Sequence, residues 1–116
     1  MKPNPVRKIA IIGDYLPRKC GIATFSHSVY RALSEDTATN ECFIVAVNDV
    51  PEGYAYPPEV RFEIAEQDLT SYRRAADFLN LTDTDVICLQ HEFGIYGGPA
   101  GSHILTLLRH VHIPVV

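Results

Sequence analysis

Two polar, glycine-containing segments hold the residues whose types and spacing could do chemistry. The first is RKCGIAT at residues 18–24, and the second is HEFGIYGG at residues 91–98. The first follows a short apolar run and opens a helical pattern, and the amides at the start of a helix favour an anion. In the second, a histidine stands beside a carboxylate, a pair that can orient a hydroxylated substrate or transfer a proton. Its glycines would let backbone amides approach a ligand closely.

Each segment also has a purely structural interpretation. Gly21 could be a turn residue with unusual backbone angles, and Arg18 and Lys19 could be solvated surface charges. His91 and Glu92 could bond to the backbone at a strand terminus while the neighbouring glycines make a tight turn, since such loops are common scaffolding. From the residues alone, the functional and the structural interpretations both stay open.

Several sharper motifs are excluded. The sequence after the first apolar run has neither GxGxxG nor GxxxxGK[ST], so it carries no dinucleotide fingerprint and no P-loop. Residue 95 is Ile, so the second segment lacks the second histidine of a zincin motif. The three cysteines, Cys20, Cys42 and Cys88, are odd in number and widely spaced, which predicts neither a disulfide framework nor a zinc site. We therefore expect no metal.

The elements that must position these segments alternate between strand and helix. Short apolar runs are followed by segments of helical periodicity, and the second helix has Asp68, Thr70 or Ser71 as candidate caps. In the first helix, Ile22 and Phe25 begin the apolar stripe that should face the sheet. We expect strands at residues 8–13, 42–48, 60–64, 85–90 and 113–116, and helices at 22–34, about 68–80 and 99–111.

This alternation predicts an α/β fold with a Rossmann-like, doubly wound, mainly parallel sheet. Helices should cover both faces, and the expected strand order is 3-2-1-4-5. In that order the loops after the first and fourth strands flank the topological switch point, where ligands bind in such folds. The two chemically interesting segments should therefore face each other across one crevice.

Composition limits the possible function classes. The chain has 116 residues, which suits one domain, with 47% hydrophobic and 21% charged residues and a formal net charge of −4. Basic residues are not clustered, so nucleic acid is not an expected partner. No apolar run approaches a membrane span, and the N-terminal MKPNPVRK lacks the apolar core of a signal peptide. A cytoplasmic protein is expected.

Three longer segments carry a family resemblance. They are IIGDYLPRKCGIATFSHSVYRAL, PEGYAYPPEVRFEI with SYRRAADFL, and DVICLQHEFGIYGGPAGSHILTLLR, which together span nearly the whole chain. The sequence resembles the N-terminal domain of nucleotide-sugar-dependent glycosyltransferases of the GT-B fold, and most closely family four, the group 1 glycosyl transferases. The combination of the first loop with QHEFGIYGG is fairly specific, whereas neither piece alone would be.

The resemblance implies an enzyme that moves a hexose from a nucleoside diphosphate sugar to a small-molecule or glycan acceptor. It implies no metal or other cofactor, and it implies that this domain mainly shapes the acceptor side of a cleft between two domains. The residues that it places near the donor phosphates are Cys20, Gly21, Ile22, Ala23 and Thr24. The residues that it places along the cleft are His91, Glu92, Phe93, Gly94, Tyr96, Gly97 and Gly98.

The sequence departs from the family in two ways. The family carries a histidine just after the fifth strand, and its C-terminal domain holds most nucleotide-sugar contacts and a pair of glutamates in an E-x7-E pattern. Residues 1–116 contain neither, so they look like a single domain truncated inside its fifth strand. We expect this fragment to be inactive alone, because the leaving diphosphate needs positioned donors from the other half. We also expect self-association through residues 113–116, since an uncovered strand edge invites pairing.

Two alternatives belong to other classes. The chain could be a non-enzymatic Rossmann-like module that binds a nucleotide or pairs with another protein. It could also be a small flavodoxin-like cofactor binder, although no convincing phosphate loop supports that interpretation.

Overall fold

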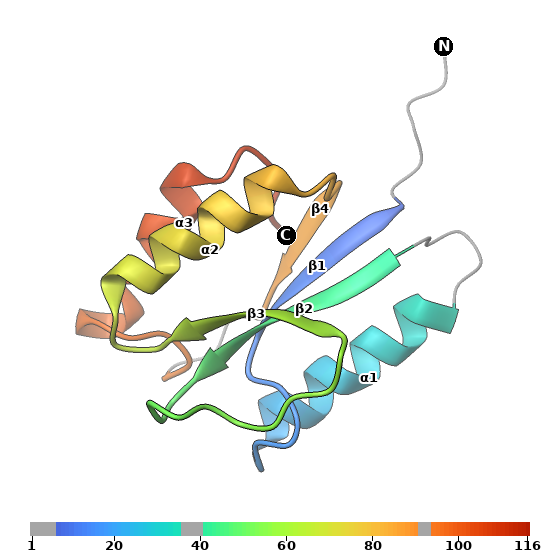
Figure 1. The fold of residues 1–116 in the computed structure, drawn as a ribbon, viewed down its shortest axis with the longest axis horizontal. Coiled ribbons are helices and arrows are strands. Elements are labelled where there is room, and N and C mark those ends of the chain that lie inside the picture. The colour runs from blue at the N-terminus through green and yellow to red at the C-terminus, as the bar shows by residue number, and fades with distance from the viewer. Residues whose placement is uncertain (1–6, 36–40, 91–93) are drawn as a thin grey trace.

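The computed structural model describes residues 7–35, 41–90 and 94–116, and within them the fold is α/β with an all-parallel sheet (Figure 1). The strands are β1 (Lys8–Gly13), β2 (Glu41–Asn48), β3 (Val60–Ala65) and β4 (Val86–Leu89), in the spatial order β3-β2-β1-β4. The helices are α1 (Gly21–Glu35), α2 (Leu69–Leu81), the short 3-10 helix η1 (Pro99–Gly101) and α3 (Ile104–His110). Helix α1 covers one face of the sheet, and α2 and α3 cover the other (Figure 1). The predicted α/β class with helices on both faces is confirmed.

The two central strands are apolar because they are covered on both faces. Every residue from Phe43 to Val47 in β2 is completely buried, as are Ala10, Ile11 and Ile12 in β1. Successive side chains of a strand point to opposite faces of the sheet, so each of these strands contributes side chains to two hydrophobic cores. One core contains Ile12 and α2, and the other contains Ile11 and the inner side of α1. Continuous apolar runs of this kind are typical of parallel strands between two helical layers.

The predicted fifth strand is the first difference. In the described chain the sheet has four strands, and residues 113–116 lie beside β4 without forming a named strand. Val115 makes an isolated parallel bridge with Ile87, and the Ile87 amide donates to the Pro114 carbonyl at 2.9 Å. The segment therefore lies on the side of β4 where a fifth strand was expected. Pro114 has no N–H to extend the pairing.

The predicted third helix is the second difference, because its 13 expected residues do not form one helix. Ala100 has a φ of 53° and Gly101 a φ of 76°, both in the left-handed region. An α-helix cannot continue through left-handed residues. The segment therefore divides into η1, which has Pro99 in its first turn, and the separate helix α3.

Helix α1 packs against the core through Ile22, Val29 and Leu33, so its predicted apolar stripe fails at one position. Phe25 was expected to face the sheet, but it is 50% exposed. The fully buried residues of α1 are instead the small Ala23 and Ser26. Small side chains let the helix axis approach the sheet closely, and Phe25 lies on the solvent side of the stripe. Helix α2 follows the prediction more closely, and Asp68 is its cap, with its carboxylate accepting from the Thr70 amide at 3.0 Å.

No helix in the described ranges is both long enough and apolar enough to cross a membrane.

Self-association through residues 113–116 stays a prediction. One side of this segment bonds to β4, Val116 is 75% exposed, and sheet edges pair readily with other chains. We expect an average mass above that of the monomer in multi-angle light scattering at high protein concentration. Replacing Val116 with lysine should restore the monomer, because a charged edge opposes pairing. A monomeric mass at all concentrations would contradict the prediction.

Candidate functional site

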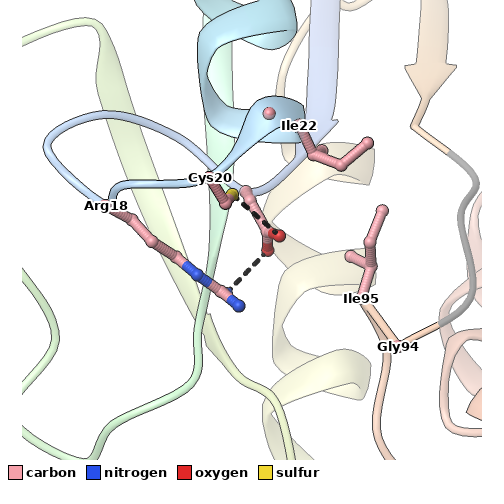
Figure 2. Close-up of a pocket in the computed structure, with 7 residues that line it drawn as sticks. Arg18, Cys20, Ile22, Gly94 and Ile95 are labelled. Carbon is pink, nitrogen blue, oxygen red and sulfur yellow. Dashed lines mark hydrogen bonds and ion pairs between the residues drawn. The ribbon is translucent and has the colours of Figure 1, made fainter.

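A pocket of about 270 Å³ lies beyond the carboxyl ends of β1 and β4 (Figure 2). Strand β1 pairs with β2 on one side and with β4 on the other, so this is the point where the strand order reverses. Such switch points are where open α/β sheets bind ligands. The pocket is lined by Asp14, Arg18, Cys20, Gly21, Ile22, Gly94 and Ile95. The two segments singled out from the sequence therefore do meet at one pocket.

A buried ion pair forms one wall of the pocket. Asp14 directly follows β1 and is only 4% exposed, and Arg18 Nη1 donates to Asp14 Oδ1 at 2.9 Å (Figure 2). Burial raises the pKa of Asp14, while the nearby Arg18 guanidinium opposes that rise. Arg18 Nη2 also lies 3.7 Å from Asp49 Oδ2, beyond the end of β2. The pairs hold the guanidinium at the pocket, so the interpretation of Arg18 as a solvated surface charge is wrong.

The start of α1 forms the adjoining wall. The Cys20 carbonyl accepts from the Thr24 amide at 3.2 Å, and the Cys20 sulfur accepts from the Ala23 amide at 3.3 Å. Cys20, the residue before α1, thus caps the first turn of the helix. The first amides of a helix have no carbonyl acceptor within that helix. In α1 these are the amides of Gly21 and Ile22, and both residues line the pocket.

Gly21 has no structural reason to be glycine. Its φ is not among the positive values, so the interpretation as a turn residue with unusual angles is wrong. Apart from its chain neighbours and its own helix backbone, a Cβ added at Gly21 would meet no atom of the described residues within 4 Å. The space above this backbone is open at the pocket, so a ligand could approach the amide closely.

The second segment divides between two roles. Gly94 and Ile95 line the pocket, and Figure 2 shows Ile95 on the side facing Ile22 of α1. Tyr96 is buried and donates its hydroxyl to the Gln90 carbonyl at 2.5 Å, and it is not among the lining residues.

Gly97 and Gly98 also do not line the pocket, and they contact the turn before α2 and α2 itself. The Gly97 amide donates to the Tyr72 hydroxyl at 3.0 Å, and the Gly98 amide donates to Gln67 Oε1 at 3.3 Å. In the first segment, Ala23 is buried on the inner face of α1. Thr24 is exposed, and its hydroxyl donates to the Cys20 carbonyl. The expectations for His91, Glu92 and Phe93 concern residues outside the described ranges.

Sequence reasoning missed Asp14 and Ile95 as pocket residues. Asp14 had a usable signal, because a carboxylate that directly follows a buried parallel strand lies at the ligand-binding edge of the sheet. Its spacing of four residues from Arg18 was a second signal, since the two form the ion pair. Ile95 had no such signal, because it is one apolar residue within a glycine-rich loop.

A second pocket, of about 360 Å³, lies beyond the ends of β2 and β3, lined by residues 48–51 and 65–68. Its polar side chains are largely engaged by the protein. Asn48 donates to Glu63 at 2.9 Å and accepts from the Tyr56 hydroxyl at 2.5 Å, and Asp68 caps α2. The pocket between β1 and β4 is the better candidate site because it lies at the switch point and both segments singled out from the sequence line it. Within the ranges that the structure describes, no group of three His, Cys, Asp or Glu residues could hold a metal ion.

Comparison of the chain with models of protein families, with curated proteins and with solved structures finds no match. The chemistry of the pocket and the sequence resemblance are therefore the basis for a functional proposal.

Proposed function

We propose that this chain is the N-terminal domain of a nucleotide-sugar-dependent glycosyltransferase of the GT-B fold, which transfers a hexose to an acceptor. The observation that carries the proposal is the pocket at the switch point between β1 and β4. It is built from the same two loops on which the sequence resemblance depends. The alternation of strands and helices predicted that these loops would meet, and residues of both line this pocket.

The chemistry of the pocket suits the diphosphate of a nucleotide sugar. Arg18 supplies a fixed cation, and the first amides of α1 supply N–H groups beside it. A guanidinium can bind a phosphate through two parallel hydrogen bonds. Asp14 holds the guanidinium in place before any ligand arrives. In a transferase, such preorganised groups stabilise the charge that develops on the leaving diphosphate.

The proposal is tested by titrating the ¹⁵N-labelled chain with UDP, GDP and ADP and following its amide signals. We expect at least one nucleotide to shift the signals of residues 20–24 and of Gly94. Gly21→Asp should weaken that binding by about tenfold or more, because it adds a like charge where the diphosphate approaches. The same variant should keep its stability, since a carboxylate in the first turn of a helix is favourable by roughly 0.3–1 kcal/mol.

The control for charge is Gly21→Ala, whose Cβ meets no described residue outside its own helix within 4 Å, so it should fold normally and should weaken binding less than Gly21→Asp. If no nucleotide shifts these signals, the proposal is contradicted. In this proposal a second domain supplies the remaining donor contacts, so the 116-residue chain should release no nucleoside diphosphate from a nucleotide sugar.

A further inference from the structure

The glycine loop, defined here as residues 94–98, rests directly on the turn between β3 and α2. Tyr72 of α2 is completely buried, and its hydroxyl is shared between the two. The hydroxyl donates to the Glu66 carbonyl at 2.8 Å and accepts from the Gly97 amide at 3.0 Å. One side chain therefore uses both its donor and an acceptor position to join the loop to the turn.

The contact between the loop and the turn is too close for a side chain. A Cβ at Gly97 would lie 2.0 Å from the Glu66 carbonyl oxygen and 2.8 Å from Gln67 Oε1. Gln67 also accepts from the Gly98 amide at 3.3 Å. Gly97 thus serves close backbone packing on the turn, away from the pocket, whereas a Cβ at Gly98 would instead lie 2.4 Å from His103 Nδ1.

The turn that receives the loop is itself held firmly. The Ser71 hydroxyl accepts from the Ala65 amide at 3.0 Å and lies 2.7 Å from the Asp68 carbonyl, to which it donates. The Glu66 amide donates to the Asn48 carbonyl at 3.0 Å, which ties the turn to the end of β2. Because the turn is fixed in this way, it also fixes the position of the glycine loop that packs against it.

We propose that Tyr72 is a positioning residue for the pocket between β1 and β4. Gly94 and Ile95 line that pocket and lie two or three residues before Gly97. By holding the Gly97 amide, the Tyr72 hydroxyl therefore fixes the position of the pocket wall that Gly94 and Ile95 form. Tyr72 touches no ligand in this arrangement and acts through the loop. The consequence for ligand binding rests on the proposed function, whereas the consequence for loop geometry does not.

The test is Tyr72→Phe, which removes the hydroxyl and keeps the ring. In the ligand-free protein, we expect the Gly97 amide to exchange with solvent about tenfold faster, because it loses the Tyr72 hydroxyl as its hydrogen-bond acceptor. We also expect the amide signals of Gly94 and Ile95 to shift. With UDP as the probe, binding should weaken by about threefold to tenfold, since a misplaced wall reduces preorganisation.

The matched control is Tyr56→Phe, which removes a part-buried tyrosine hydroxyl at a different place, the one that donates to Asn48. It should lower stability by a similar amount and leave the signals of Gly94 and Ile95 in place. If Tyr72→Phe does not fold, Gln67→Ala replaces it, because Gln67 is exposed and bonds the loop at Gly98.

The proposal is overturned if the folded variant leaves the Gly94 and Ile95 signals unchanged, or if Tyr56→Phe moves them equally. If the wild-type chain binds no UDP, GDP or ADP but the ligand-free signals move as expected, the proposed function fails while the positioning role stands.

Discussion

Replacing Gly97 with alanine is expected to destabilise the protein more than any other single glycine-to-alanine change at the two loops. The new Cβ would lie 2.0 Å from the Glu66 carbonyl oxygen, which is backbone and cannot rotate away. Overpacking of a buried site costs typically 1–3 kcal/mol, and a clash with backbone lies at or beyond the upper end, so we expect about 3 kcal/mol or more. The midpoint of thermal unfolding should fall by roughly 10 °C or more.

Gly21→Ala is the matched control, because it makes the same chemical change at the other loop. Its Cβ has open space, and alanine in a helix is favoured over glycine by roughly 0.5–1 kcal/mol, so this variant should be as stable as the wild type or more stable. Urea unfolding of both variants measures the difference. Equal stability of the two would show that the glycine loop does not pack on the turn before α2 as the structure has it.

Replacing Arg18 with methionine should have the second-largest effect on stability. Asp14 is nearly inaccessible, and removal of the guanidinium leaves its carboxylate without the cation that pairs with it at 2.9 Å. Breaking a buried ion pair by removing one partner costs roughly 3–5 kcal/mol. We expect about 2–3 kcal/mol here, because the Arg18 side chain is 18% exposed and the pair is therefore only partly buried. The measurement is the free energy of unfolding in urea at neutral pH.

The deficit of Arg18→Met should depend on pH. Burial raises the pKa of folded Asp14 above its ordinary value of 3.8, so the folded state holds the proton more tightly than the unfolded chain does. Protonated Asp14 therefore stabilises the folded state fully when pH is below the pKa of Asp14 in the unfolded chain. This stabilisation is lost as pH rises through the higher pKa of Asp14 in the folded state. Without Arg18 the folded pKa rises further, so the difference between variant and wild type should be largest near pH 7 and should shrink as pH falls.

A double variant separates the charge from the packing of the arginine side chain. Adding Asp14→Asn to Arg18→Met removes the buried charge, so it should recover much of the lost stability. The deficit of this double variant relative to Asp14→Asn alone should be independent of pH, because neither protein then carries the Asp14 carboxyl. A deficit of the single variant that does not shrink as pH falls from 7 toward the ordinary Asp pKa of 3.8 would show that packing, and not the unpaired carboxylate, dominates.

Much of the architecture could be predicted from the sequence because it depends on local patterns. The apolar runs that became β1 and β2 are buried on both faces, and a run of that kind is visible without knowing its neighbours. The cap of α2 at Asp68 is likewise a local interaction, since its carboxylate bonds an amide two residues later. The alternation of strands and helices then limits the order of the sheet, so the meeting of the two loops at the switch point also followed.

Backbone conformation at single residues was not predictable in the same way. Pro99 correctly indicated a helix start, but the left-handed φ of Ala100, which divides the expected helix, has no signal in a residue that favours helices. The exposure of Phe25 in α1 was also hidden, because the apolar spacing made it look like a core residue. Close packing of Ala23 and Ser26 on the sheet decided otherwise.

The roles within the glycine loop depended on contacts between distant parts of the chain. The sequence by itself determined that glycines and polar residues follow β4 at the ligand-binding edge. It did not distinguish Gly94, which lines the pocket, from Gly97, which must lack a side chain because Glu66 lies against it. That distinction was decided by the tertiary structure, since the Gly98 amide bonds a residue 31 positions away and its partner cannot be read from spacing. Local periodicity therefore determined which elements form, and long-range packing of backbone on backbone decided what each glycine does.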